Sequence, residues 1–392
     1  MLPIVVAAVT TILCLAGLGY YLLALWSARA FQHQLRRPLP DFQPGVSILK
    51  PVKGLDPEMY SSFASHCVQQ YQGPYEILFG VSNMADPAVG AIEKLQAEFP
   101  ERTIRLVLCP QLLGANGKVS NLVQMLGSAQ YEYILINDSD IKVSPLYLRR
   151  IMGCFQMPKR RGGRVGLVTA LYRGQANQSI GSRMEALGIA TDFIAGVLTA
   201  RQIEDGIRFG LGSTLAVSRL ALEAIGGLEP LVDYLADDYE LGARVWRSGF
   251  ELVLSGEVVE TFLPQYRFGQ FLAHQIRWSR STRFSRKLGY TGMVFTYGLP
   301  WALCNLIASG ASLSSIALLS LTLLARVALA LSVGVGVLGD GQVLRDLWLL
   351  PLRDFFGLGF WAWSFAGDTV VWRGELFRLR KGRITSVGSD SP

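Results

Sequence analysis

The stretch YEYILINDSD, residues 131–140, decides the fold class of this chain. Residues 131–136 predict a buried strand, and the polar residues Asn137, Asp138, Ser139 and Asp140 follow where that strand ends. Upstream of it, strands are expected at 46–49, 76–81 and 103–108, and helices at 57–70, 88–99 and 118–126. This alternation of strands and helices predicts an open, largely parallel α/β sheet. Ligands bind such sheets beyond the carboxyl ends of the strands.

Two details of this region refine the expectation. Asp56 precedes Pro57, which predicts that the Asp56 side chain caps the first helix. No Gly-x-Gly-x-x-Gly follows any of the strands, and the chain has no Walker A motif. The sequence therefore argues against a dinucleotide-binding or P-loop domain.

The apolar residues gather at the two ends of the chain. Half of the 392 residues are hydrophobic and 17% are charged, whereas about a quarter are charged in typical soluble domains. Residues 1–28 carry no charge and predict one transmembrane anchor, with a cleaved signal peptide as the alternative. Arg29, Arg36 and Arg37 follow at once. The positive-inside rule then predicts an integral membrane protein whose catalytic domain faces the cytoplasm.

Residues 288–392 predict a C-terminal membrane module with a basic tail, and residues 41–287 a soluble domain between the two membrane parts. Helices are expected near 293–309 and 315–338. The second would hold Arg326 at mid-membrane depth, where it either faces a polar interior or snorkels to the interface. The run from Phe355 to Trp372 either crosses the bilayer or is re-entrant, and the sequence leaves both open.

Three groups of polar residues suggest chemistry. Asp138 and Asp140 at a strand end suit Mg²⁺ or Mn²⁺, although the same residues also favour a turn. Asp238 is either a general base or a carboxylate that stabilises a helix N-terminus. Arg277 either holds a diphosphate or begins a basic strip, 277–287, that attracts anionic lipid. The net charge of +7 is partly this strip, which argues against nucleic acid as a partner.

Taken in order, these features resemble the membrane-bound, inverting nucleotide-sugar glycosyltransferases with a GT-A fold. Within them, the chain is most similar to the ceramide glucosyltransferase family, family 21, including its bacterial hopanoid-modifying relatives. The resemblance covers nearly the whole chain and rests on residues 46–57, 86–88, 117–122, 226–242 and 371–374. It implies a Rossmann-like GT-A domain inserted between an N-terminal transmembrane helix and a C-terminal helical membrane module.

The resemblance also implies residue roles. Asp86 matches the family's first aspartate, expected at the uracil, and Lys118 and Asn121 match the segment beside the nucleotide. Asp138 and Asp140 match the second motif, with Asp140 as the better metal ligand. The remaining matches are Asp238 as catalytic base, Arg277 and Trp278 in the (Gln/Arg)-x-x-Arg-Trp signature, and Gly212 and Ser213 as a weaker acceptor-side segment. His274 stands at the first position of that signature, a departure that leaves its contribution to acceptor binding open.

The predicted function is transfer of a sugar from a UDP-sugar, with a divalent cation, to a hydroxyl of a membrane lipid. Glucose to ceramide is the leading assignment, and N-acetylglucosamine to a hopanoid polyol is the close competitor. A catalytically inactive membrane scaffold is the alternative of another class. The intact Asp138, Asp140, Asp238 and Arg277 argue against it. A processive polysaccharide synthase and a transporter fit less well, because the membrane spans are few and more than half of the chain is soluble.

Overall fold

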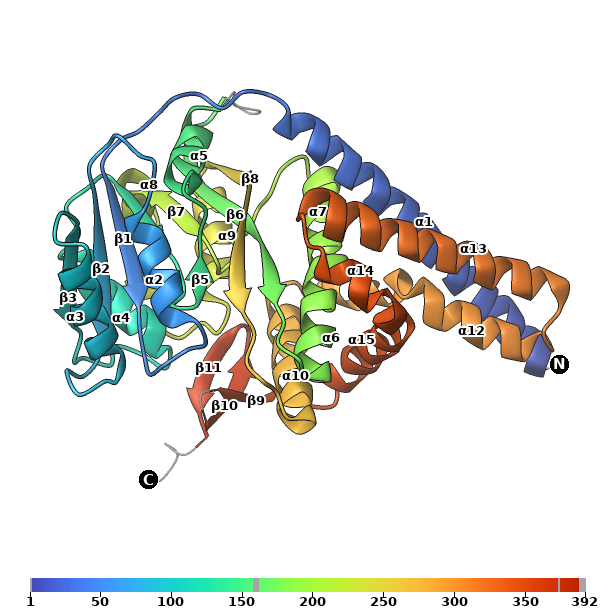
Figure 1. Cartoon of the computed structure of the whole chain (residues 1–392). Helices are drawn as coiled ribbons and strands as arrows, with labels where there is room; N and C mark the ends of the chain where they lie inside the picture. Colours follow the sequence, from blue (N-terminus) through green and yellow to red (C-terminus); the bar gives the residue numbers. More distant parts are fainter. Residues whose placement is uncertain (1, 158–161, 373, 388–392) are drawn as a thin grey trace. The chain divides into compact units, whose positions relative to one another are not determined.

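The computed structural model describes residues 2–157, 162–372 and 374–387 (Figure 1). Met1 of the predicted anchor and Arg373 of the 371–374 motif lie outside them. The chain forms two compact units. The sheet unit comprises Arg37–Gln175, Glu204–Pro264 and Arg380–Pro392, and the helical unit comprises Met1–Arg36, Ala176–Ile203 and Gln265–Leu379. Residues 176–203 and those from 265 onward thus group with the terminal helices. The functional division at residues 28, 41 and 287 stays a prediction.

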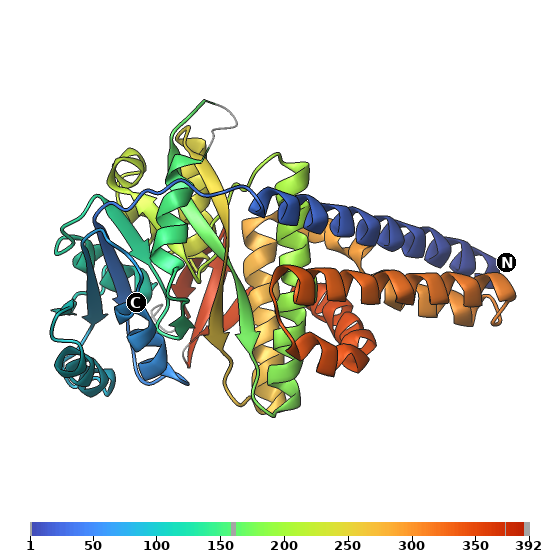
Figure 2. The ribbon, with the colours of Figure 1, turned by 45° about the horizontal axis from the view of Figure 1, so that its top comes forward.

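An eight-stranded sheet in the order β3-β2-β1-β4-β7-β6-β8-β5 forms the centre of the sheet unit (Figures 1 and 2). Strands β3, β2, β1 and β4 pair parallel in that order, as do β6 and β8, whereas β7 pairs antiparallel with β4 and β6, and β5 pairs antiparallel with β8. The strands are β1 Val46–Pro51, β2 Tyr75–Val81, β3 Thr103–Leu108, β4 Tyr133–Ile136, β5 Ile141–Lys142, β6 Val165–Gln175, β7 Leu215–Ser218 and β8 Glu251–Phe262, with β11 Arg383–Ser386 outside this sheet. The predicted strand-helix alternation is confirmed.

The helices of this unit include the three that were expected, α2, α3 and α4. They are α2 Met59–Cys67, α3 Ala88–Glu98, α4 Gly117–Leu126, α5 Tyr147–Gly153, α8 Arg219–Ala224 and α9 Asp237–Arg247, with short 3₁₀ turns at Cys154–Gln156 and Glu229–Leu231. All six residues of β1 are buried, as expected for a parallel strand covered on both faces. The Asn116 side chain caps α4 by accepting a hydrogen bond from Val119 N. Because β1 is covered on both faces, side chains that bind a ligand are expected at the carboxyl ends of β1 and β4.

The expected cap of α2 is wrong. The helix begins at Met59, and Glu58 occupies the cap position with φ 52° and no side-chain hydrogen bond. Asp56 instead accepts a hydrogen bond from the Ser139 hydroxyl. A long-range partner at the end of β4 therefore outcompetes the local cap.

The helical unit is built from segments far apart in the sequence. Its helices are α1 Leu2–Leu35, α6 Ile180–Gly188, α7 Ile194–Ile203, α10 Phe268–Ser285, α11 Lys287–Gly292, α12 Gly298–Ala308, α13 Leu313–Ala330, α14 Gln342–Asp346 and α15 Leu350–Ser364. Short 3₁₀ turns cover Met293–Thr296 and Leu347–Leu349, and π-helical segments cover Ile189–Phe193 and Leu331–Val337. The strands β9 Thr369–Trp372 and β10 Glu375–Arg380 pair antiparallel. Helices α1, α12 and α13 run side by side (Figures 1 and 2).

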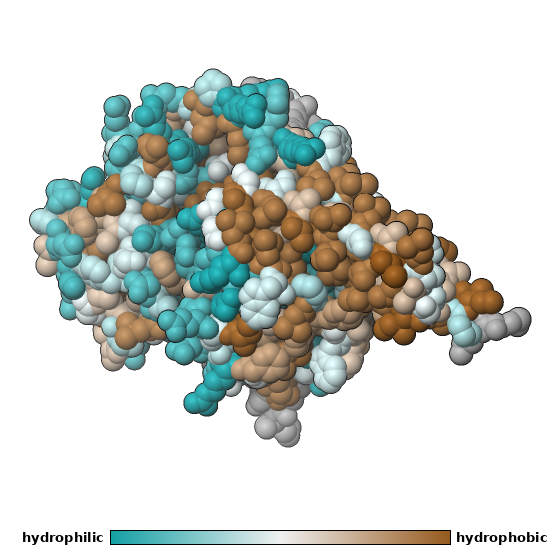
Figure 3. Space-filling view, turned by 45° about the vertical axis from the view of Figure 1, so that its right-hand side comes forward, coloured by the Kyte–Doolittle hydropathy of each residue, from teal (hydrophilic) through white to brown (hydrophobic). Residues whose placement is uncertain are grey.

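Among the residues that the structure describes, three helical segments are long and apolar enough to cross a membrane: Pro3–Leu35, Ile180–Ile203 and Leu313–Val337. The most apolar windows of the first and third are only 22% and 33% buried, whereas that of Ile180–Ile203 is 67% buried. Figure 3 shows apolar side chains gathered on the surface of the helical unit. Exposed apolar side chains such as Ile12 on α1 and Leu324 on α13 favour contact with lipid. These helices indicate membrane association.

The expected helix at 293–309 is shorter than predicted, since α12 begins at Gly298. The helix expected at 315–338 is α13, continued as π-helix to Val337. The run from Phe355 to Trp372 is divided between α15 and β9. The conformation therefore changes near Asp368, the charge that interrupts this run in the sequence.

Arg326 faces the protein interior, and the snorkelling alternative is wrong. Its side chain is 2% exposed, and its guanidinium donates to both Asp354 carboxylate oxygens at 2.8–3.1 Å. It also donates to Asp192 Oδ1 at 2.5 Å and to the Thr191 hydroxyl at 3.2 Å. These partners stabilise a charge that would be costly in hydrocarbon.

Candidate active site

The end of β4 is held by the buried side chain of Asn137. Its Nδ2 donates to Ser213 O at 2.6 Å and to the Tyr147 hydroxyl at 3.0 Å. Its Oδ1 lies 3.3 Å from His66 Nε2. Burial lowers the pKa of His66 well below its ordinary value, so this imidazole is neutral. Asn137 thus fixes the backbone from which Asp138 and Asp140 project.

Lys118, in the first turn of α4, joins two of the acidic segments. Its ammonium lies 2.7 Å from Asp138 Oδ1 and 3.2 Å from Asp237 Oδ2. Burial opposes the charged form, but Asp138 and Asp237 outweigh it and raise the pKa of Lys118. The structure therefore brings together the predicted residues Lys118, Asp138 and, beside Asp237, Asp238.

Asp238 lies in the first turn of α9, and its Oδ1 accepts a hydrogen bond from Tyr239 N at 2.8 Å. Burial and the adjacent Asp237 carboxylate raise the pKa of Asp238 to about 6, against the opposing charge of Lys118. A carboxylate with this pKa is ionised at neutral pH and is a stronger base than an ordinary aspartate. That property suits general base catalysis.

Gly212 lies directly against this carboxylate. A Cβ added at Gly212 would come 3.1 Å from Asp238 Oδ2, so a side chain there would crowd the proposed base. The neighbouring Ser213 gives its carbonyl to Asn137, and its buried hydroxyl has no hydrogen-bond partner among the residues the structure describes. The weakly predicted acceptor-side segment is thus adjacent to Asp238.

Asp140 follows β4 and accepts a hydrogen bond from the Thr261 hydroxyl on β8. Burial and the nearby Asp138 charge raise the pKa of Asp140 to about 6, although the Thr261 bond lowers it. Across residues 2–157, 162–372 and 374–387, no three His, Cys, Asp or Glu side chains are grouped to hold a metal ion. Mg²⁺, however, is commonly held by one or two carboxylates together with substrate phosphates. Asp138 and Asp140 fit an ion that binds with a diphosphate.

Lys50 also belongs to this region, although no role was predicted for it. Its side chain at the end of β1 is fully buried, and its ammonium donates to Asp138 O at 3.0 Å. Burial lowers the pKa of Lys50 to about 7, although Asp140 and Asp138 partly counter this effect. The available signal in the sequence was a single lysine near the end of an otherwise apolar strand. A lysine in such a buried setting is rare unless it is paired, so it indicates a polar partner nearby.

Asp86 and Asn121 form separate hydrogen-bonded groups near the end of β2. Asp86 accepts from Gly54 N at 3.0 and 3.1 Å and from Ala88 N at 2.9 Å. Gly54 has φ +73°, a conformation that favours glycine. Asn121 accepts from the Ser82 hydroxyl at 3.0 Å. Both residues hold the loops that follow β1 and β2, and their contacts with a nucleotide remain predictions.

His274, Arg277 and Trp278 belong to α10 of the helical unit. The ring centroids of His274 and Trp278 lie 5.2 Å apart, and that of Phe193 lies 6.3 Å from that of Trp278. Further along the basic strip, Arg280 and Arg283 donate to the carbonyls of Thr369 and Gly367. These two arginines therefore fix the segment before β9, and their roles are at least partly structural.

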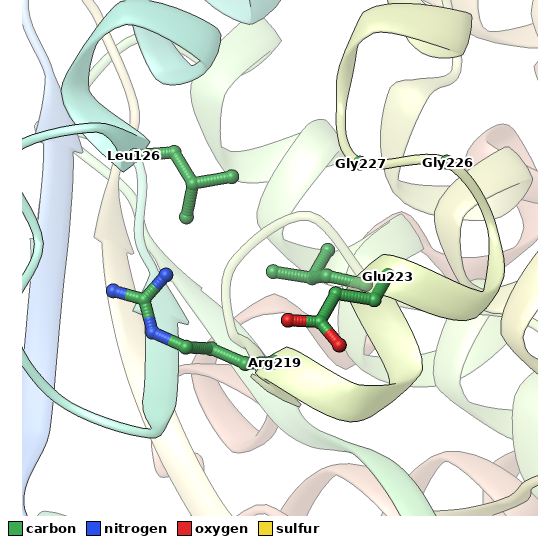
Figure 4. Close-up of a pocket in the computed structure, with 6 residues that line it drawn as sticks. Leu126, Arg219, Glu223, Gly226 and Gly227 are labelled. Atoms are coloured by element: carbon green, nitrogen blue, oxygen red, sulfur yellow. The ribbon is translucent and has the colours of Figure 1, made fainter.

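A surface pocket of about 290 Å³ lies elsewhere in the sheet unit, between α4 and α8 (Figure 4). Its lining includes Leu126, Arg219, Glu223, Gly226 and Gly227. Arg219 is occupied by the carbonyls of Tyr131 and Ala129, at 2.8 and 2.5 Å. The pocket contains none of the predicted site residues.

Comparison with known proteins shows which family this chain resembles. The family described as "Glycosyl transferase family 21" matches residues 9–385. Ceramide glucosyltransferase 3 of Caenorhabditis elegans is 25% identical over 288 residues, covering 69% of this chain and 59% of that protein. Ceramide glucosyltransferase 1 of the same organism is 24% identical over 212 residues, covering 54% and 44%. The chain thus spans about half the length of these relatives.

Among solved structures, the chain is similar to a mannosyltransferase from Pyrobaculum calidifontis in complex with GDP-Man and Mn²⁺. The TM-score is 0.54 and the identity 19%, and the match covers 92% of this chain and 97% of that one. At this identity the likeness shows the fold alone. The predicted GT-A-like α/β architecture, flanked by an N-terminal apolar helix and C-terminal apolar helices, is confirmed.

Proposed function

Because this chain belongs to glycosyl transferase family 21, we propose that it transfers a sugar from a UDP-sugar to a hydroxyl group of a membrane lipid, most simply glucose from UDP-glucose to ceramide. The observation that carries the proposal is the arrangement of Asp238, Asp237, Lys118 and Asp138, in which a base with a raised pKa adjoins a largely buried cation. The similarity to ceramide glucosyltransferases supports the choice of lipid.

In the proposed reaction Asp238 accepts the proton of the acceptor hydroxyl. The oxygen attacks the anomeric carbon as the bond to the diphosphate breaks, so that the configuration inverts in one displacement. Asp238 is suited to this step because its pKa of about 6 leaves it ionised at neutral pH. Gly212 keeps the space beside the carboxylate free for the hydroxyl.

Asp138 and Asp140 would hold Mg²⁺ or Mn²⁺, which neutralises a bound diphosphate and makes it a better leaving group. Lys118 and Lys50 position the Asp138 segment by an ion pair and a backbone hydrogen bond. Asp86, Asn121 and Lys118 are the proposed nucleotide contacts. Arg277 is proposed to stabilise the leaving diphosphate, and His274 and Trp278 to contact the acceptor.

A lipid acceptor requires a protein at the bilayer, which fits the exposed apolar flanks of α1 and α13. Arg29 lies in the last turns of α1, and Arg36 and Arg37 follow it; under the positive-inside rule they support a cytoplasmic position for the domain that follows. This orientation would give the enzyme access to cytoplasmic UDP-sugars. It can be checked by protease protection in sealed membrane vesicles.

The decisive experiment incubates the purified protein with labelled UDP-glucose or UDP-N-acetylglucosamine and with ceramide or a hopanoid polyol. Glucosylceramide formed by the wild type, and lost in Asp238→Asn, is the expected result. If product forms only from UDP-N-acetylglucosamine and the hopanoid polyol, the proposed substrates are wrong. The reaction class, transfer of a sugar to a lipid hydroxyl, would still stand. Absence of product from every pair, with intact UDP binding, would contradict lipid glycosylation.

A further inference from the structure

A buried carboxylate on α6 lies outside the residues discussed so far. Glu185 is 2% exposed, in a segment, Ile180–Ile203, apolar enough to cross a membrane. A buried carboxylate costs free energy unless hydrogen bonds compensate it. The side chains that hydrogen-bond to Glu185 therefore indicate its role.

Three side chains converge on this carboxylate. His274 Nδ1 lies 3.0 Å from Glu185 Oε2, and Gln275 Nε2 donates to the same oxygen at 3.3 Å. The Tyr266 hydroxyl donates to Oε1 at 3.4 Å. Two of these groups, the Gln275 amide and the Tyr266 hydroxyl, donate to the carboxylate. A deprotonated carboxylate can only accept, so its hydrogen bond with His274 requires the proton on Nδ1.

This hydrogen bond fixes the tautomer of the imidazole. With the proton on Nδ1, a neutral His274 carries a lone pair on Nε2, which becomes a hydrogen-bond acceptor. Nε2 has no hydrogen-bond partner within the described part of the chain, and the side chain is 20% exposed. The ring is held between Tyr266 and Trp278, with centroids 5.6 and 5.2 Å away. His274 thus presents an oriented acceptor atom beside aromatic surface.

We propose that Glu185 is a positioning residue that holds His274 as the Nδ1–H tautomer, so that Nε2 accepts a hydrogen bond from a hydroxyl of the lipid head group. This inference rests on the proposed function and names the group that recognises its acceptor. An aromatic surface with one acceptor atom matches an amphipathic alcohol, whose hydrocarbon packs on Trp278 while its hydroxyl meets Nε2. It also gives the histidine that replaces Gln or Arg in the signature a defined role.

The kinetic test compares Glu185→Gln, His274→Gln and the double variant at saturating UDP-sugar. A glutamine at position 185 can donate a hydrogen bond to Nδ1 of His274. The imidazole is then no longer held as the Nδ1–H tautomer. The KM for a short-chain ceramide should rise about tenfold, the scale of one lost hydrogen bond, while the KM for UDP-glucose changes less than about twofold. If Glu185 acts through His274, the double variant should match His274→Gln alone. Additive effects, or an equal rise in the KM for both substrates, would overturn the proposal.

His33→Gln is the matched control, because His33 is an exposed histidine of the same unit. It should leave both KM values unchanged. A rise in the ceramide KM of His33→Gln equal to that of His274→Gln would show a general effect of replacing histidines and would count against the proposed site.

A second readout does not depend on catalysis. With ¹⁵N-labelled histidine the chain has three imidazoles, and His274→Gln identifies the resonances of His274. Nδ1 should show the shift of a protonated nitrogen in the wild type and lose it in Glu185→Gln. Ceramide should shift Nε2, whereas its 1,3-di-O-methyl ether, which lacks a free hydroxyl, should not.

The two readouts separate the two hypotheses. If no sugar is transferred to any lipid but ceramide or a hopanoid polyol still shifts Nε2, the proposed reaction fails and the hydroxyl site stands. If sugar is transferred but ceramide causes no shift of the Nε2 resonance, the proposed role of Glu185 is wrong. It is also wrong if Nδ1 is unprotonated in the wild type.

Discussion

The ammonium of Lys118 lies 2.7 Å from Oδ1 of Asp138, and this ion pair connects the start of α4 to the end of β4. Because the same ammonium also reaches Asp237, three chain segments depend on one side chain. Charge at Lys118 and at Asp237 therefore acts on the neighbouring Asp238 with opposite signs.

The rate should fall on the acid side with a midpoint near pH 6, because protonation of Asp238 removes the proposed base. Asp237→Asn removes a negative neighbour, which should lower the pKa of Asp238 and move the acid limb of kcat/KM to lower pH. Lys118→Met removes a positive neighbour and should move the limb to higher pH. Profiles measured for the three proteins test this, and shifts of the same sign in both variants would contradict it.

Asp238→Asn should lower kcat by at least about 10²-fold, the usual contribution of a general base. Isothermal titration should show UDP binding within about twofold of the wild type, because the change is isosteric. Glu93→Gln, a change at an exposed acid of α3, should leave both quantities unaltered. Turnover retained in Asp238→Asn would remove this residue from the proposed mechanism.

Asp140→Ala should abolish the dependence of UDP binding on Mg²⁺ or Mn²⁺. The raised pKa of Asp140, about 6, predicts in addition that wild-type metal affinity falls as pH drops through 6, since protonated carboxylates bind metal poorly. Calorimetric titration of UDP with and without metal measures both effects. Metal-dependent binding that survives in the variant would refute the ligand assignment.

Lys50→Met should stabilise the fold, and more so at pH 7 than at pH 10. The folded-state pKa of Lys50 is lowered to about 7, so the wild type bears the full cost of burying this charge below pH 7. The cost declines as pH rises toward the unfolded pKa of 10.5. The difference in melting temperature between variant and wild type at the two pH values checks the sign. If the gain in melting temperature is larger at pH 10 than at pH 7, burial of the charged Lys50 does not destabilise the fold.

Arg326→Met should destabilise the helical unit by about 3–5 kcal/mol, because it leaves the carboxylate of Asp354 buried without its partner. The double change Arg326→Met with Asp354→Leu should recover part of this loss. Free energies of unfolding in detergent micelles measure the difference. Equal losses in the single and double variants would mean that the pair is not coupled.

Much of the sheet could be predicted from the sequence, because its elements are local patterns. Apolar runs such as 76–81 predict strands, and the 3–4 spacing of apolar residues in 88–99 predicts a helix. Asp138 was identifiable because it follows a predicted strand at the edge where ligands bind.

Other features depended on contacts between distant segments. Asp56 is drawn to Ser139 rather than to the start of its own helix. Glu185 lies in a helical run with no local motif, and its pairing with His274 joins residues 89 positions apart. The burial of Lys50 depends on a helix that covers the sheet, since its ammonium lies 5.9 Å from the ring centroid of Phe63 on α2. Such relationships are set by tertiary structure, which periodicity alone does not record.

The close contact between α1 and α12 has a consequence for biosynthesis. Gly17 and Gly298 allow the two backbones to approach so closely that a Cβ on Gly17 would lie 2.3 Å from the other Cα, and Asn305 donates to Thr11 at 2.7 Å. The ribosome makes α1 first and α12 only after most of the chain. Throughout that interval the small and hydroxyl-bearing face of α1 lacks its partner. In a nascent chain arrested before Gly298, this face of α1 would therefore be exposed to membrane chaperones and proteases. These proteins could then recognise the chain as incompletely folded.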